Sequence, residues 1–172
     1  MGMRSEIYTL FYSGEVAMKL AIAEDLYSRY GQTLVRQPNI MAQLAEVVAA
    51  EHSLQSQMGA MAMGVTCTRC ASRQGGGCCS GYMAAENDVL QLLMNMLAGI
   101  QVDVHPGEGI ECCFLGETGC VLSFKPMFCL NYICSHIKGD EESATLLLLE
   151  RRTGSLLRKQ ADMEKLLLDF FL

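Results

Sequence analysis

Residues 67–79 read CTRCASRQGGGCC and hold four of the nine cysteines in this chain. A second stretch, residues 112–134, holds the other five, and the sequences on either side of these stretches hold none. Thiols at this density serve as disulfides, as metal ligands or as redox groups. The rest of the sequence decides among these three uses.

The length and the start of the chain argue against disulfides. A chain of 172 residues is long enough to bury a core without covalent crosslinks. The beginning, MGMRSEIYTLFYSGEV, lacks the apolar region of an export signal, and the longest apolar stretch, 89–102, is too short to span a bilayer. We therefore expect a cytoplasmic, reducing location, where clustered cysteines more often bind metal.

The charge of the chain excludes two classes of partner. The net charge is −6, and the densest basic group, within residues 151–159, lies among acidic residues. Binding to nucleic acid or to an anionic membrane needs clustered lysine and arginine. We expect neither nucleic acid nor a membrane as a partner.

Apolar residues recur at helical spacing on both sides of the cysteine stretches. Residues 5–12 fit either a helical turn or a short strand, and 100–111 reads as a loop or short hairpin. Ser13 and Asp140 are expected helix caps, and Gly31 is an expected helix end. The predicted helices cover about 16–30, 39–61, 84–98, 126–138 and 140–172.

These elements predict a mainly α fold, with residues 1–172 in a single domain. We expect a helical bundle of about five helices with a cysteine-rich metal-binding insertion, at about 64–136, between the N-terminal and C-terminal helices. The twelve methionines are interpreted as filler on apolar helical faces rather than as a copper site, because no regular Met-x-x-Met run is present.

The last predicted helix carries an apolar stripe in which residues are spaced by threes and fours. Such a stripe either packs inside the monomer or forms the seam of a homodimer through the C-terminal helix, and core packing is the commoner case. Thr153 and Gln160 interrupt the stripe. Its members are Leu146, Leu149, Thr153, Leu156, Gln160, Met163, Leu167 and Phe170.

The two motifs of the first cysteine stretch favour metal ligation. Cys67-x-x-Cys70 is expected to form a tight turn that directs both sulfurs at one ion. A redox dithiol has the same spacing, but it usually follows a strand, whereas a predicted helix precedes this motif. Adjacent side chains diverge, so Cys78-Cys79 suits two ions or a multinuclear cluster; the alternative is a pair of buried free thiols.

The second stretch resembles a known family. Residues 112–132 read CCFLGETGCVLSFKPMFCLNY, which resembles the motif C-x-F-L-x-x-x-G-x-C-x-I-Y-x-x-R-P-x-x-C-x-x-[FY] of the zinc- or iron-chelating CxxCxxCC domain family. That family includes proteins described as flagellin lysine N-methylases. Seven residues rather than two separate Cys70 from Cys78, and Lys125 stands where arginine is usual. With small gaps, the matching positions are Cys112, Phe114, Leu115, Gly119, Cys120, Pro126, Cys129 and Tyr132.

The resemblance implies a set of ligands. Cys113 is the spare thiol, although it could exchange roles with Cys112, and His105 and His136 are substitutes for which a surface role is favoured. In one regular helix over 126–138, Cys129 and Cys134 would lie about 140° apart, so both ligate only if the helix starts late or they serve different metals. The implied ligands are Cys67, Cys70, Cys78, Cys79, Cys112, Cys120, Cys129 and Cys134.

Eight thiolates suit two zinc ions or one or two iron–sulfur clusters. We therefore expect a cysteine-cluster metal-binding protein, whose metal orders a middle segment with too little apolar surface to order itself. The alternatives are an iron–sulfur redox or sensor protein and, from the family resemblance, an enzyme like the protein lysine N-methylases. No glycine-rich strand–loop–helix for a nucleotide-like cofactor is visible, which favours a protein that is not an enzyme.

Overall fold

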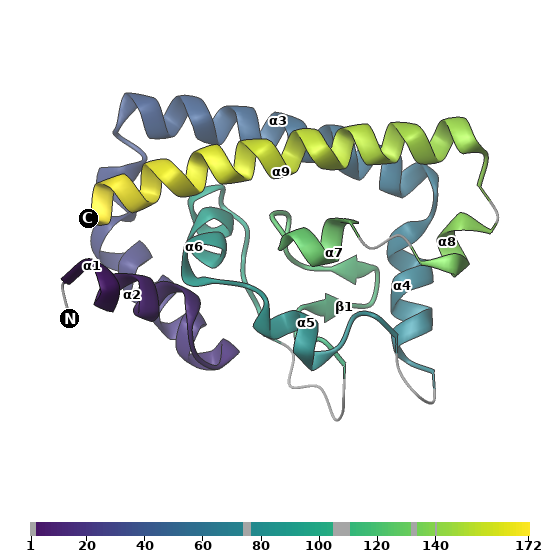
Figure 1. Ribbon diagram of the computed structural model, residues 1–172, viewed down its shortest axis with the longest axis horizontal. Helices are drawn as coiled ribbons and strands as arrows, with labels where there is room; N and C mark the ends of the chain where they lie inside the picture. Colours follow the sequence, from purple (N-terminus) through teal and green to yellow (C-terminus); the bar gives the residue numbers. More distant parts are fainter. Residues whose placement is uncertain (1–2, 74–76, 105–110, 132–133, 140) are drawn as a thin grey trace.

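The computed structural model describes residues 3–73, 77–104, 111–131, 134–139 and 141–172. Helices dominate it, which confirms the prediction of a mainly α fold (Figure 1). The elements are α1 (Met3–Tyr12), α2 (Val16–Leu34), α3 (Pro38–Ala60), α4 (Met63–Ala71), α5 (Gly81–Ala85), α6 (Val89–Leu97), β1 (Leu115–Gly116), β2 (Gly119–Cys120), α7 (Met127–Asn131), α8 (Ser135–Lys138) and α9 (Ser143–Phe171).

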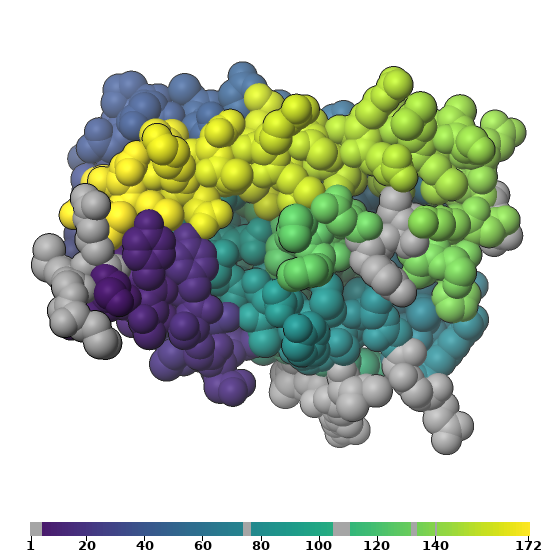
Figure 2. All heavy atoms as spheres, in the orientation of Figure 1, coloured from purple at the N-terminus to yellow at the C-terminus, as the bar shows by residue number. Residues whose placement is uncertain are grey.

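Helices α3 and α9 lie side by side along one edge of the molecule and pack against each other over most of their length (Figures 1 and 2). Most of the apolar stripe of α9 is buried within the monomer, against α3, α6 and α7, including both of its polar members. The core-packing interpretation of the stripe is therefore confirmed, while a homodimer through this helix stays a prediction. The buried stripe residues are Leu149, Thr153, Leu156, Gln160, Met163 and Leu167.

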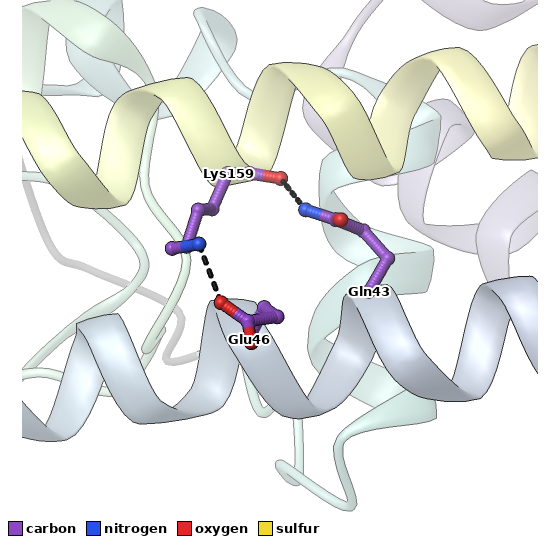
Figure 3. Close-up of polar contacts among 3 residues, drawn as sticks. All are labelled: Gln43, Glu46 and Lys159. Atoms are coloured by element: carbon purple, nitrogen blue, oxygen red, sulfur yellow. Dashed lines mark hydrogen bonds and ion pairs between the residues drawn. The ribbon is translucent and has the colours of Figure 1, made fainter.

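Polar contacts fix the register between these two helices (Figure 3). Gln43 Nε2 donates to the carbonyl oxygen of Lys159 at 3.0 Å, and Lys159 Nζ contacts Glu46 Oε2 at 2.5 Å. The hydrogen bond from Lys159 lowers the pKa of the Glu46 carboxyl. Arg152 Nη1 donates to the carbonyl oxygen of Ser53 at 2.9 Å. The basic residues of α9 thus bind α3 in part, rather than forming only a solvated face.

Helix α6 lies at the centre of the fold, between α2 and α9, and is buried nearly all round. The helix predicted over 84–98 is wrong as a single element, because it is divided into α5 and α6. Asp88 causes the division, since its Oδ1 accepts a hydrogen bond from the Gln91 amide at 2.8 Å and so starts a new helix. Because α6 lies within residues 64–136 and belongs to the core, the predicted cysteine-rich insertion is not confirmed.

Asn95 of α6 joins the core to the segment that follows the hairpin. Its side chain is fully buried, and its Nδ2 donates to the carbonyl oxygen of Phe124 at 2.9 Å. Its Oδ1 accepts from the backbone amides of Ser123 at 2.9 Å and Phe124 at 3.0 Å. We call these three hydrogen bonds the Asn95 clamp. Phe114, Leu122 and Phe124 are also buried. Residues 64–136 thus contribute apolar side chains to the core, while the expectation that a metal orders this segment stays a prediction.

Several predicted boundaries also change. Residues 5–12 are helical, within α1. Helix α2 passes through Gly31, which is buried beside the Tyr27 ring, and ends at Leu34. The residue that caps α2 is Glu15 rather than Ser13. The helix predicted over 126–138 is divided into α7 and α8, while Asp140 and residues 105–110 lie outside the described residues.

None of the described helices combines the length and the apolar character that a membrane crossing requires.

Replacing Asn95 with leucine should destabilise the protein strongly. The change leaves the buried amides of Ser123 and Phe124 without acceptors, and each unsatisfied buried group costs about 1–3 kcal/mol. We expect a loss of about 3 kcal/mol or more in the free energy of unfolding, measured by urea denaturation. The control is Gln55→Leu, an exposed amide on α3, which should change little. Equal effects of the two substitutions would show that the clamp is unimportant.

Leu167→Asp should also destabilise the fold, because Leu167 is fully buried in the stripe of α9. Burying an unpaired charge and losing the leucine contacts together cost about 3 kcal/mol or more. Lys165→Asp is the matched control, since this lysine is exposed and makes only a surface ion pair with Asp169. Thermal melting and sedimentation of both variants test this. An unchanged melting temperature and mass for Leu167→Asp would mean that α9 is not part of the core.

Candidate metal centre

Seven of the eight cysteines that the sequence predicts as ligands line one cavity of about 100 Å³. They come from α4, the segment before α5, the segment before the hairpin, strand β2, α7 and the residue before α8. These elements meet around the hairpin in Figure 1. The cysteines are Cys67, Cys78, Cys79, Cys112, Cys120, Cys129 and Cys134.

The Cys67-x-x-Cys70 motif forms part of helix α4, so the predicted tight turn is wrong. Ala62, with φ of 49°, separates this helix from α3 and sets its new direction. Cys67 faces the cavity, whereas the Sγ of Cys70 lies 4.0 Å from Nδ1 of His136 on α8. Cys70 is therefore the one predicted ligand that the structure leaves outside the cavity.

Close packing between α4 and the hairpin brings Cys67 to Cys120. A Cβ atom at Gly64 would come within 2.2 Å of the Thr118 carbonyl oxygen, so only glycine permits this approach. Gly119 faces Gly64 with φ of +122°, a conformation that also favours glycine. The Thr68 hydroxyl donates to the carbonyl oxygen of Gly116 at 3.0 Å and holds the same contact.

Backbone pairing brings the two cysteine stretches together. Ser80 forms an isolated antiparallel bridge with Glu111, and the Cys112 amide donates to the carbonyl oxygen of Cys79 at 3.1 Å. Cys112 lines the cavity and Cys113 does not, so the structure favours Cys112 as the member of this pair that faces the site.

Cys79 lies within hydrogen-bonding reach of the sulfurs of Cys67 and Cys78, and its single thiol proton can be donated to one of them at a time. This interaction lowers the pKa of Cys67 to about 7 and that of Cys78 to about 6. The same interaction raises the pKa of Cys79, which is the donor. Cys67, Cys78 and Cys79 therefore form a group of interacting thiols within the cavity. The group contains cysteines from both motifs of the first cysteine stretch.

Burial is the largest effect on the pKa values of three further thiols in the cavity, Cys112, Cys120 and Cys129. Burial raises the pKa of Cys112 to about 11 and that of Cys129 to about 12, and it also raises the pKa of Cys120. Lys125 is only 6% exposed and lines the same cavity. Its charge acts in the opposite direction and favours the thiolate form of Cys120 and Cys129.

Because α7 and α8 are separate helices, Cys129 and Cys134 can face the same cavity. Cys134 is the N-cap of α8 and has an extended backbone, so the two cysteines do not belong to one regular helix. Both line the cavity. The angular conflict expected for a single helix over 126–138 therefore does not arise. Tyr132 and His105 lie outside the described residues.

The seven thiols line one cavity, but they do not converge on a single point. In the described part of the chain, no three cysteine, histidine, aspartate or glutamate side chains are placed so that they could hold a metal. The chemistry of the lining nevertheless fits a soft metal, because the described lining residues include seven thiols and no carboxylate.

Sequence reasoning missed three methionines, Met58, Met63 and Met83, which add thioethers to the cavity wall. Their irregular spacing gives no local signal, because they come from α3, α4 and α5. Comparison with protein-family models, with curated proteins and with solved structures finds no match to this chain. The resemblance to the CxxCxxCC family therefore stays a prediction.

Proposed function

We propose that this chain is a metal-binding protein whose metal is held by thiolates in the cysteine-lined cavity. The observation that carries the proposal is the convergence of seven thiols, from segments far apart in the sequence, on one small space. Thiolate ligands need a reducing compartment, so the proposal includes the cytoplasmic location that the sequence predicts.

The size and lining of the cavity support an inorganic occupant. A volume of about 100 Å³ is below the range of about 300–1,000 Å³ that organic ligands use. Sulfur ligands select zinc or iron–sulfur clusters over magnesium and calcium. The ammonium of Lys125 offsets part of the negative charge that several thiolates bring to one metal.

Metal binding must draw the thiols closer together than they lie in this structure, because no described group is arranged to hold an ion. Cys67, Cys78 and Cys79 are the natural starting point, since Cys79 already lies within hydrogen-bonding reach of the other two sulfurs. Cys112, Cys120 and Cys129 line the same cavity, and Lys125 favours the thiolates of Cys120 and Cys129. These thiols would then close around the metal together with the first three.

Zinc and an iron–sulfur cluster remain the two candidates for the occupant, and they imply different functions. Zinc closed by four thiolates is structural, whereas an iron–sulfur cluster would make the protein a redox carrier or sensor. A visible absorption spectrum separates them, because zinc is colourless. The methylase alternative gains no support, since the sheet in the described residues is a single two-stranded hairpin that offers no nucleotide-binding unit.

Protein purified without oxygen should contain zinc or iron, and single substitutions in the cavity should remove most of it. Cys79→Ser and Cys129→Ser each delete a thiol from the cavity, whereas Cys113→Ser deletes one outside it and is the matched control. Elemental analysis of the four proteins is the measurement. The proposal fails if the native protein holds neither metal above background while all nine thiols react with a thiol reagent.

Removing the metal should loosen the walls of the cavity more than the helical frame. We expect faster amide hydrogen exchange in α4 and α7 after treatment with a chelator, because metal ligation orders the segments that carry the ligands. Exchange in α3 and α9 should change little, since apolar packing holds these helices. Equal protection of α4 with and without chelator would contradict a structural role for the metal.

A further inference from the structure

Cys70, the predicted ligand that does not line the cysteine cavity, has a histidine beside it. Its Sγ lies 4.0 Å from Nδ1 of His136, which comes from α8, and α8 packs against α4 (Figure 1). His136 is exposed and Cys70 is half-buried, so the two side chains are open to solvent. We call Cys70 and His136 the outer pair. The proposed metal site in the cavity does not use them.

The separation of the two ligand atoms in the outer pair suits one metal ion. Tetrahedral bonds of about 2.3 Å to sulfur and about 2.0 Å to nitrogen place these atoms about 3.5 Å apart, and linear bonds place them about 4.3 Å apart. The observed distance of 4.0 Å lies between these values. In the described part of the chain, no group of three possible ligands is arranged around an ion. An ion held by the outer pair would therefore have two protein ligands, keep open positions and leave readily.

The outer pair lies next to the cavity in the chain and in space. Cys67, which lines the cavity, is three residues before Cys70 on α4, so the two thiols lie on the same side of this helix. A Cβ atom at Gly77 would lie 3.1 Å from the Cys70 sulfur. This sulfur therefore lies against the backbone that leads directly into Cys78.

Cys78 connects the outer pair with the cavity. Its side chain is exposed and also lines the cavity, so it lies where the cavity meets solvent. The interaction with Cys79 is the largest effect that lowers the pKa of Cys78, and the charge of His136 lowers it as well. His136 therefore lies near Cys78 in addition to its contact with Cys70.

We propose that the outer pair is an entry site, which captures a divalent thiophilic metal ion from solution and passes it to Cys78 and Cys67 in the cavity. This inference rests on the proposed metal-binding function. On capture, the ion bonds to the Cys70 sulfur and to His136 Nδ1, and the Cys70 thiol releases its proton. On transfer, those two bonds break as bonds to Cys78 and Cys67 form. The two cavity thiols then release their protons, and Cys70 takes one up.

The chemistry of the outer pair suits transfer better than storage. Thiolate and imidazole are both ligands for zinc. The open positions of an ion with two protein ligands let an incoming thiol bind before an outgoing ligand leaves. An ion held beside Cys78 also has a high effective concentration at the cavity, because transfer takes place within one molecule. A hydrogen bond that only holds α8 against α4 would have none of these consequences.

The direct test follows the ring nitrogens of the histidines by ¹⁵N NMR while Zn²⁺ is added to the full chain. Once the cavity is filled, we expect one further Zn²⁺ to bind weakly and to shift Nδ1 of His136, but not the ring of His52, an exposed histidine of α3. Cys70→Ser should weaken this binding by more than about tenfold, because even a supporting residue of a metal site contributes about 10–100-fold in affinity. Cys113→Ser is the matched control, since Cys113 does not line the cavity.

The rate of metal uptake tests the transfer itself. Metal-free protein is mixed with Zn²⁺ held by a coloured chelator, and the loss of colour is followed in stopped flow. Cys70→Ser and His136→Asn should slow uptake several-fold and leave the final metal content unchanged, whereas His136→Cys should restore the rate, because a thiolate replaces the imidazole as a ligand. Asparagine can hydrogen-bond to Cys70, so unchanged uptake in His136→Asn would overturn the proposal.

Two further results would overturn the entry site. One is the absence of a His136 shift at millimolar Zn²⁺. The other is a metal content in Cys70→Ser as low as that in Cys129→Ser, which would make Cys70 a ligand of the cavity itself. His136 is exposed, so its variants should keep their helical content.

The same measurements separate this inference from the proposed function. If the cavity binds zinc tightly and His136 does not respond, only the entry site fails. If the cavity binds no metal, the proposed function and the transfer both fail, even where the His136 shift shows weak zinc binding at the outer pair.

Discussion

The candidate site depends on one buried amide, which attaches the backbone of the segment after the hairpin to the apolar core. Asn95 hydrogen-bonds the backbone on both sides of Phe124, and that segment leads directly into Lys125 and the helix that carries Cys129. An apolar residue at this position could fill the space but could not satisfy the backbone. The position of the site therefore depends on α6, which is buried on nearly every side.

The molecule joins two regions that are stabilised in different ways. The frame of α2, α3, α6 and α9 buries leucine and methionine side chains, each worth about 1.5–3 kcal/mol. The walls of the cysteine cavity depend instead on backbone pairing, glycine contacts and hydrogen bonds. Thiols are small and gain little from packing. The first region explains why the chain folds, and the second explains where the thiols meet.

Much of the frame could be predicted from the sequence, because the spacing of apolar residues in α3 and α9 is regular over many turns. Asp88 before an apolar run is a signal in the sequence for the start of α6. The placement of Cys67 and Cys70 in a helix against the hairpin could not be predicted, because it depends on the contact between Gly64 and the hairpin. Seven of the eight thiols that the family resemblance implies as ligands line the cavity, although the resemblance itself stays a prediction. The motif could not predict that Cys70 lies outside the cavity. The Cys70 sulfur lies beside His136, which comes from the far end of the cysteine-rich region.

The contact between Gly64 and Gly119 bears on how such a sequence could change over time. Neither glycine contributes to the apolar frame, so a larger residue at either position would push α4 from the hairpin while leaving the long helices in place. Both positions must therefore remain glycine if the cavity is to keep its shape, and this requirement cannot be seen from the pattern of cysteines. A descendant could retain all nine thiols and the same helical shape and still have lost the space in which they meet.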